Sequence, residues 1–161
     1  MLDASLCGGS SLRKRAGGAE GDPVLFFEDL TVGQSAETTR VVGSQDIEAF
    51  AAVSGDTNPV HLDAAYAATT QFGERIAHGM LAAAYISAVL GVQLPGPGAI
   101  YLTQSLRFRR PVKIGDAVTA RVEVTALEER RGQATLATVC LVGGKPAVDG
   151  EALVMIPRRP A

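Results

Sequence analysis

The stretch Gly79-Met80-Leu81-Ala82-Ala83-Ala84-Tyr85-Ile86-Ser87-Ala88-Val89-Leu90-Gly91 decides the fold of this chain. Its residues are apolar nearly all round a helical wheel, and only Ser87 interrupts the pattern. A helix of this kind is buried on most of its sides rather than laid on a surface. It is too short to cross a bilayer, which needs about 20 apolar residues. The stretch therefore predicts one central, buried helix.

The residues after this helix change to a period of two, which is typical of strands. Beyond the turn Pro95-Gly96-Pro97-Gly98, the first expected strand places Ile100, Leu102, Leu106 and Phe108 on one face, with Tyr101, Thr103, Ser105, Arg107 and Arg109 on the other. Further strands are expected over 118–124, 134–142 and 148–156, with Gly143-Gly144-Lys145 as a hairpin connection.

The residues before the helix predict a strand within 35–42, a short helix from Ser44 to Gly55, a turn-rich loop, and another short helix that Asp63 caps. One strand, then helices, then a run of strands indicates an α+β fold. We expect an antiparallel sheet with one buried helix against it.

The first 24 residues read differently from the rest. Their glycine pairs and lack of apolar periodicity predict a disordered tail, which leaves residues 25–161 as a single domain. They contain no apolar stretch of the length that a secretory signal needs, and their acidic residues are unusual for a mitochondrial transit peptide.

Composition excludes several classes of partner. Fifteen Lys and Arg against 17 Asp and Glu give a net charge of −2, so attraction to nucleic acid or to an anionic membrane is not expected. Two cysteines, Cys7 and Cys140, do not make a disulfide framework, and they favour a reduced, cytoplasmic setting.

Both histidines of the chain fall within 18 residues, in the blocks Ser54-Gly55-Asp56-Thr57-Asn58-Pro59-Val60-His61 and Ile76-Ala77-His78-Gly79-Met80. Asp56 and His61 lie on one loop that Pro59 stiffens, and such a pair can bind and deprotonate a water molecule. Gly79 begins the buried helix, where free N–H groups and the helix dipole favour an oxyanion. These are two of the parts needed to hydrate an activated double bond.

The chain resembles the MaoC-like hydratases, and within them the short (R)-specific enoyl-CoA hydratases. The resemblance spans about residues 26–157. It is carried by Asp56-Thr57-Asn58-Pro59-Val60-His61-Leu62-Asp63, Phe72-Gly73-Glu74-Arg75-Ile76-Ala77-His78-Gly79-Met80, Pro95-Gly96-Pro97-Gly98-Ala99-Ile100-Tyr101 and Arg110-Pro111-Val112-Lys113-Ile114-Gly115-Asp116. It implies a hot-dog fold, in which a curved antiparallel sheet wraps a long helix.

The resemblance also implies a reaction, the syn addition of water to a trans-2-enoyl-CoA to give an (R)-3-hydroxyacyl-CoA. By this carry-over, Asp56 is the general base, His61 holds and polarises the water, and the Gly79 N–H receives the thioester oxygen. A homodimer is expected, with no cofactor beyond the CoA of the substrate.

Other residues enter as candidates around this centre. Those expected to brace the loop or to contact substrate are Asn58, His78, Ser87 and Leu90, and those that could meet the CoA phosphates are Arg107, Arg109, Arg110 and Lys113. His78 could instead only brace the helix entry by hydrogen bonds, and the basic cluster could simply be solvated.

Several alternatives stay open. Asp56 could be a loop acid that makes a turn to Asn58. A metal site from His61, Asp63 and His78 is not expected, since no ligand spacing recurs. Rival functions are a dehydratase of acyl-carrier-protein substrates, a thioesterase, or a non-catalytic acyl-binding or scaffold subunit.

Overall fold

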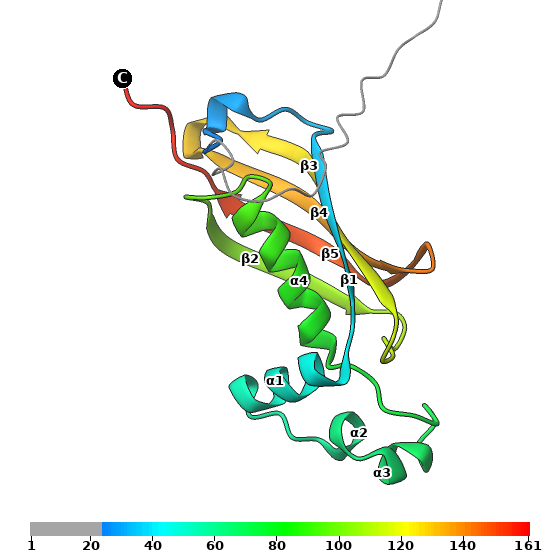
Figure 1. The fold of residues 1–161 in the computed structure, drawn as a ribbon. Helices are drawn as coiled ribbons and strands as arrows, with labels where there is room; N and C mark the ends of the chain where they lie inside the picture. The colour runs from blue at the N-terminus through cyan, green and yellow to red at the C-terminus, as the bar shows by residue number, and fades with distance from the viewer. Residues whose placement is uncertain (1–23) are drawn as a thin grey trace, which may run out of the picture.

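A five-stranded sheet and one long helix make up most of the structure (Figure 1). In this computed structural model the described residues are 24–161, so the expected tail, residues 1–24, lies outside them except for Val24. The elements are β1 (Ser35–Val41), α1 (Ser44–Ser54), α2 (Pro59–Leu62), α3 (Ala64–Ala68), α4 (Gly79–Val92), β2 (Ile100–Phe108), β3 (Ala117–Glu128), β4 (Gln133–Val142) and β5 (Lys145–Met155), with 3₁₀ turns η1 (Phe27–Asp29) and η2 (Glu129–Arg131).

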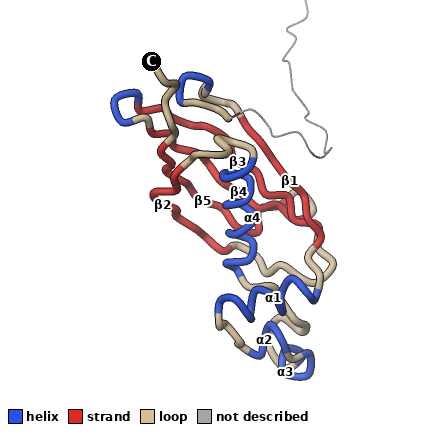
Figure 2. Tube along the Cα trace, turned by 60° about the vertical axis from the view of Figure 1, so that its left-hand side comes forward, coloured by secondary structure: helices blue, strands red, loops and turns tan. Residues whose placement is uncertain are grey.

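The sheet has the strand order β1-β3-β4-β5-β2, and every neighbouring pair is antiparallel. Helix α4 lies across one face of the sheet, and α1 to α3 gather beyond its N-terminal end (Figures 1 and 2). The alternation expected over 118–124 is present, because Val118, Ala120, Val122 and Val124 are all at most 1% exposed. The α+β hot-dog architecture expected from the sequence is confirmed.

Helix α4 begins at the expected residue and continues one residue past the expected end. Its buried residues are Leu81, Ala82, Tyr85, Ile86, Val89 and Leu90. The opposite side, which carries Met80, Ala84 and Ser87, is exposed. The expectation that α4 is buried on most of its sides is therefore wrong for the single chain, because the sheet covers only one face of the helix.

Strand β2 is an edge strand, and of its aliphatic and phenylalanine side chains only Leu106 packs against the core. Ile100, Leu102 and Phe108 are 52%, 40% and 55% exposed. A register shift between Tyr101 and Thr103 interrupts the regular alternation expected there. Within residues 24–161, no strand pairs with the outer side of β2, so its apolar residues remain at the surface of a single chain.

Strand β5 begins three residues earlier than expected. The hairpin needs only Gly143 and Gly144, both with positive φ, and Lys145 already pairs with Val142. Further along β5, Gly150 pairs with β4 on one side and with β2 on the other. A Cβ on Gly150 would lie 1.8 Å from the carbonyl oxygen of Ser105, so the close approach of β2 and β5 requires a glycine here.

Cys140 lies on β4 beneath helix α4 and is fully buried. Its thiol donates a hydrogen bond to the carbonyl oxygen of Ala82 at 3.2 Å, and burial raises the pKa of this thiol to about 12. Cys7 lies outside the described residues, and the cytoplasmic setting stays a prediction. Among residues 24–161 no helix has the length and apolarity needed to cross a membrane.

Candidate active site

The loop between α1 and α2 carries Asp56. Helix α1 ends where Gly55 adopts a left-handed conformation, with φ of 77°. The Asp56 carboxylate accepts the Asn58 N–H at 3.2 Å, and the Asn58 side chain accepts the Val60 N–H at 3.2 Å. Asn58 thus caps α2, and Pro59 occupies its first turn. The turn-rich loop expected here contains a one-turn helix, which was too short to give a periodic signal.

His61 lies on α2 and is nearly buried. Its Nδ1 is 2.8 Å from the carbonyl oxygen of Ile76. A carbonyl oxygen only accepts, so Nδ1 carries the proton of the neutral ring and Nε2 keeps a free lone pair. The backbone therefore fixes both the ring and its tautomer.

His78 is the residue that precedes helix α4, and it is only 2% exposed. Its Nε2 lies 2.9 Å from the carbonyl oxygen of Asp56, so Nε2 carries the proton. Its Nδ1 is buried with no hydrogen-bond partner in residues 24–161. The two histidine rings are in contact, with centroids 3.8 Å apart and planes tilted by 31°. His78 thus supports His61 from one side and holds the Asp56 backbone.

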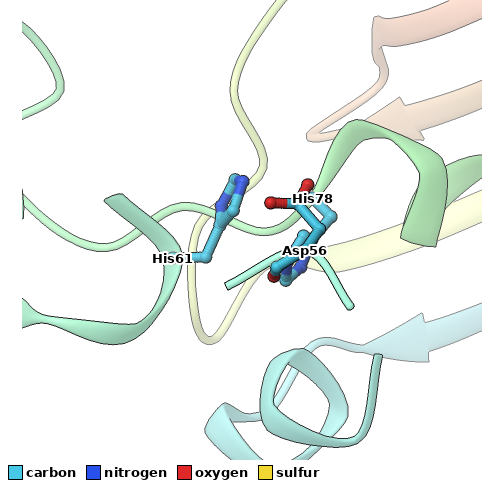
Figure 3. Close-up of side chains that lie close together, drawn as sticks. All are labelled: Asp56, His61 and His78. Atoms are coloured by element: carbon cyan, nitrogen blue, oxygen red, sulfur yellow. The ribbon is translucent and has the colours of Figure 1, made fainter. Parts of the chain in front are cut away.

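The three residues form one cluster, which Figure 3 shows. One carboxylate oxygen of Asp56 and one ring nitrogen of each histidine all lie within 4.8 Å of one another. Because backbone carbonyls occupy both ring N–H groups, the carboxylate and His61 Nε2 offer only lone pairs. The Asp56–His61 pair can accept both hydrogens of one water molecule and leave the water oxygen lone pairs free to attack.

A metal ion would use the Asp56 carboxylate and one nitrogen of each imidazole in this cluster. His61 and His78 each have one such nitrogen free, because a backbone carbonyl takes the other. Asp63, which entered the metal alternative, is not in the cluster; its carboxylate accepts the Tyr66 N–H at 3.0 Å and caps α3.

Gly79 is the first residue of α4. In the described part of the chain, neither its N–H nor that of Met80 has a hydrogen-bond acceptor, whereas the Leu81 N–H donates to the His78 carbonyl. Free N–H groups at a helix start favour an anion. A Cβ on Gly79 would lie 2.7 Å from the ring of Phe108, so the ring packs directly on this glycine.

A cavity of about 520 Å³ opens over this centre. His61, His78 and Gly79 line it together with the segment 108–112. Ser87 and Leu90 do not line it: Ser87 lies on the exposed side of α4, and Leu90 is buried in the core. The cavity is large enough for a small acyl group beside His61, whereas Asp56 is exposed and does not itself line it.

The basic candidates separate into two groups. Arg109 pairs with Asp149 at 2.9 Å, and Lys113 pairs with Glu74, whose hydrogen bond raises the pKa of Lys113. Neither Arg107 nor Lys113 lines the cavity. Arg110 lines it and pairs with no carboxylate of residues 24–161.

Residues 25–142 match the family described as the MaoC like domain. The chain belongs to the MaoC-like family. This MaoC-like chain is 54% identical to the (R)-specific enoyl-CoA hydratase of Rhodospirillum rubrum over 134 residues, which cover 83% of this chain and 93% of that protein.

Solved structures of R-hydratases are also similar to this MaoC-like domain. The unliganded R-hydratase PhaJ1 from Pseudomonas aeruginosa superposes with a TM-score of 0.80 at 54% identity, covering 84% of this chain and 87% of that one. The (R)-hydratase of A. caviae involved in PHA biosynthesis gives a TM-score of 0.79 at 54% identity, over 81% of this chain and 99% of that one.

Proposed function

We propose that this MaoC-like chain is an (R)-specific enoyl-CoA hydratase, a hydro-lyase that adds water to trans-2-enoyl-CoA. The observation that carries the proposal is the Asp56–His61 pair, which presents only lone pairs beside the free N–H groups at the start of α4. The 54% identity to (R)-specific enoyl-CoA hydratases supports the same reaction. The non-catalytic rival is disfavoured, because the chain retains both the acid and the histidine.

The first step uses Asp56 and His61 together. Water donates one hydrogen to the Asp56 carboxylate and the other to His61 Nε2, so its lone pair faces C3 of the enoyl group. As the C3–O bond forms, Asp56 takes the proton from water and the π electrons move toward the thioester carbonyl. General base catalysis of this kind contributes about 10²–10⁴-fold.

The second step returns the proton. The Gly79 N–H and the N-terminal end of α4 stabilise the negative charge on the thioester oxygen, an interaction worth about 3–4 kcal/mol per donor in comparable sites. The protonated Asp56 then delivers its proton to C2 on the same face of the double bond. One proton and one hydroxyl are added syn, and Asp56 returns to its ionised form.

The CoA portion of the substrate requires cationic contacts. Arg109 and Arg110 both line the cavity, and Lys113 does not; because Arg109 is paired with Asp149, Arg110 is the cation best placed to meet the phosphates.

A homodimer completes the proposal. The two edges of the sheet differ: β1 carries Glu37, Thr39 and Arg40 with one exposed apolar residue, Val41, whereas β2 exposes several apolar side chains together with the exposed side of α4. Charged edges resist pairing, and apolar edges invite it. We infer that two copies pair along β2.

Light scattering should therefore give a mass close to twice the 16.7 kDa of one chain. Introducing a charge at the same edge by Leu102→Lys should shift the mass toward that of one chain. The matched change Thr39→Lys on β1 should leave the dimer intact. A wild-type monomer at micromolar concentration would contradict the dimer, and the opposite behaviour of the two variants would contradict the choice of edge.

The reaction is tested with purified protein and crotonyl-CoA. We expect the absorbance of the enoyl thioester to fall while no free thiol appears, and chiral analysis to give the (R)-3-hydroxy product. A pantetheine thioester of the same acyl group should react with a higher KM, since it lacks the CoA phosphates. Thiol release without hydration would identify a thioesterase, and neither change would favour the binding subunit.

A further inference from the structure

Arg75 is a mostly buried cation that contacts active-site residues without lining the cavity. Its side chain is 16% exposed, and its Nε donates to the carbonyl oxygen of His61 at 2.6 Å. Its Nη1 donates to Ser44 Oγ at 3.1 Å, and its Nη2 lies 3.8 Å from Glu48. The last distance is too long for a hydrogen bond, so Glu48 contributes charge while the directional contacts go to His61 and Ser44.

The contact between Arg75 and His61 caps the C-terminal end of α2, a very short helix. Helix α2 has only four residues, and a single turn has almost no stability of its own. Asn58 caps its N-terminal end, whereas carbonyls at its C-terminal end have no partner within the turn. Arg75 satisfies the His61 carbonyl with a charge-assisted bond.

The same segment also holds the ring of His61. The Ile76 carbonyl accepts from His61 Nδ1, and the Ile76 N–H donates to the Val60 carbonyl at 3.4 Å. Two adjacent residues, Arg75 and Ile76, thus fix both the backbone and the imidazole of His61. The bond to Ser44 extends this restraint to α1, the helix whose end leads to Asp56.

We propose that Arg75 is a positioning residue that aligns His61 Nε2 with the Asp56 carboxylate. The proposal rests on the proposed hydratase function for its kinetic readout. Arg75 touches neither the cavity nor the reacting atoms, so it acts through His61. Displacing a group by about 1 Å can cost about 100-fold in rate, and the loss should fall on kcat while KM stays nearly constant.

The test compares Arg75→Met with Arg121→Met, which removes an arginine paired with Glu123 on β3. We expect kcat for crotonyl-CoA to fall about 30- to 100-fold in Arg75→Met with KM within about threefold, and to stay at the wild-type value in Arg121→Met. Arg75→Lys keeps the charge but lacks the planar fork, so it should recover only part of the rate. Guanidinium ion should partly rescue Arg75→Ala.

A second readout does not need activity. The chain has two histidines, so nitrogen NMR of the imidazoles resolves both rings. In the wild type, His61 should show the Nδ1–H tautomer and His78 the Nε2–H tautomer; in Arg75→Met the His61 signals should shift toward a tautomer average. If the wild type does not hydrate crotonyl-CoA but Arg75→Met still shows this shift of the His61 signals, the proposed hydratase function is wrong and the positioning role of Arg75 stands.

Other outcomes would overturn the positioning role itself. They are a kcat of Arg75→Met within twofold of wild type, or an unchanged His61 spectrum, in protein that circular dichroism shows to be folded. If Arg75→Met does not fold, Arg75→Lys carries the decision: wild-type kcat and His61 signals in that variant would also overturn the role. Glu48→Gln, which leaves both directional bonds in place, should change kcat less than threefold.

Discussion

Replacing Asp56 with asparagine is expected to lower kcat for crotonyl-CoA hydration by about 1,000-fold, within the range that a general base contributes. The amide oxygen can still accept a hydrogen bond from water, but it does not take up the proton. The Asn58 N–H can still bond to the same position, so the loop keeps its conformation. Decay of the enoyl absorbance measures the rate, and KM should change little.

Asp63→Asn is the matched control. Asp63 lies seven residues further along and caps α3, a role that asparagine fills equally well. Its kcat should stay within about twofold of wild type. If Asp56→Asn keeps a near wild-type rate, the assignment of the base is wrong even though the family is right.

Gly150→Ala is expected to have the largest effect on stability. The added methyl group would lie 1.8 Å from the Ser105 carbonyl oxygen and 2.7 Å from its carbon, both backbone atoms of a paired strand. Neither can move without breaking the β2–β5 ladder. We expect a loss of about 3 kcal/mol, the upper part of the range for overpacking, and a fall in Tm of about 10 °C. Thermal unfolding followed by circular dichroism measures it.

Gly143→Asn supplies the comparison for this substitution. It also adds a side chain to a glycine, at the tip of the hairpin, where nothing lies within 4 Å of the new Cβ. Asparagine adopts positive φ readily, and Asn-Gly is a favoured hairpin pair. Its Tm should equal or slightly exceed that of wild type. Equal Tm values for Gly150→Ala and wild type would show that β2 and β5 can separate locally without cost.

The sequence predicts the elements of this fold better than their burial. The spacing of apolar residues predicts α4 and the four strands after it, because each element is long enough to repeat its pattern. Helix α2 was missed, since four residues hold barely one turn. The exposure of Ile100 and Leu102 was not predicted, because alternation marks two faces of a strand and does not say which neighbour covers them.

The site shows a similar division. The spacing of Asp56 and His61 predicts that they lie close together. In the structure a carboxylate oxygen of Asp56 and a ring nitrogen of His61 lie within 4.8 Å of each other. No sequence signal predicts the contact of His78 with His61, or the bonds that His61 makes to the carbonyl of Ile76 and the guanidinium of Arg75. They are contacts between segments 14 to 22 residues apart that arise only when the chain folds. The pairing of Arg109 with Asp149 likewise depends on the β2–β5 register.

The buried thiol of Cys140 has a chemical consequence for an enzyme of this kind. An enoyl thioester is an electrophile, and a thiolate adds to its double bond by conjugate addition. Cys140 lies under Ala82, which lines the cavity. Because burial raises the pKa of this thiol to about 12, it stays protonated at pH 7. Burial therefore keeps this nucleophile, one layer from the cavity, in the thiol form that does not add to an enoyl thioester.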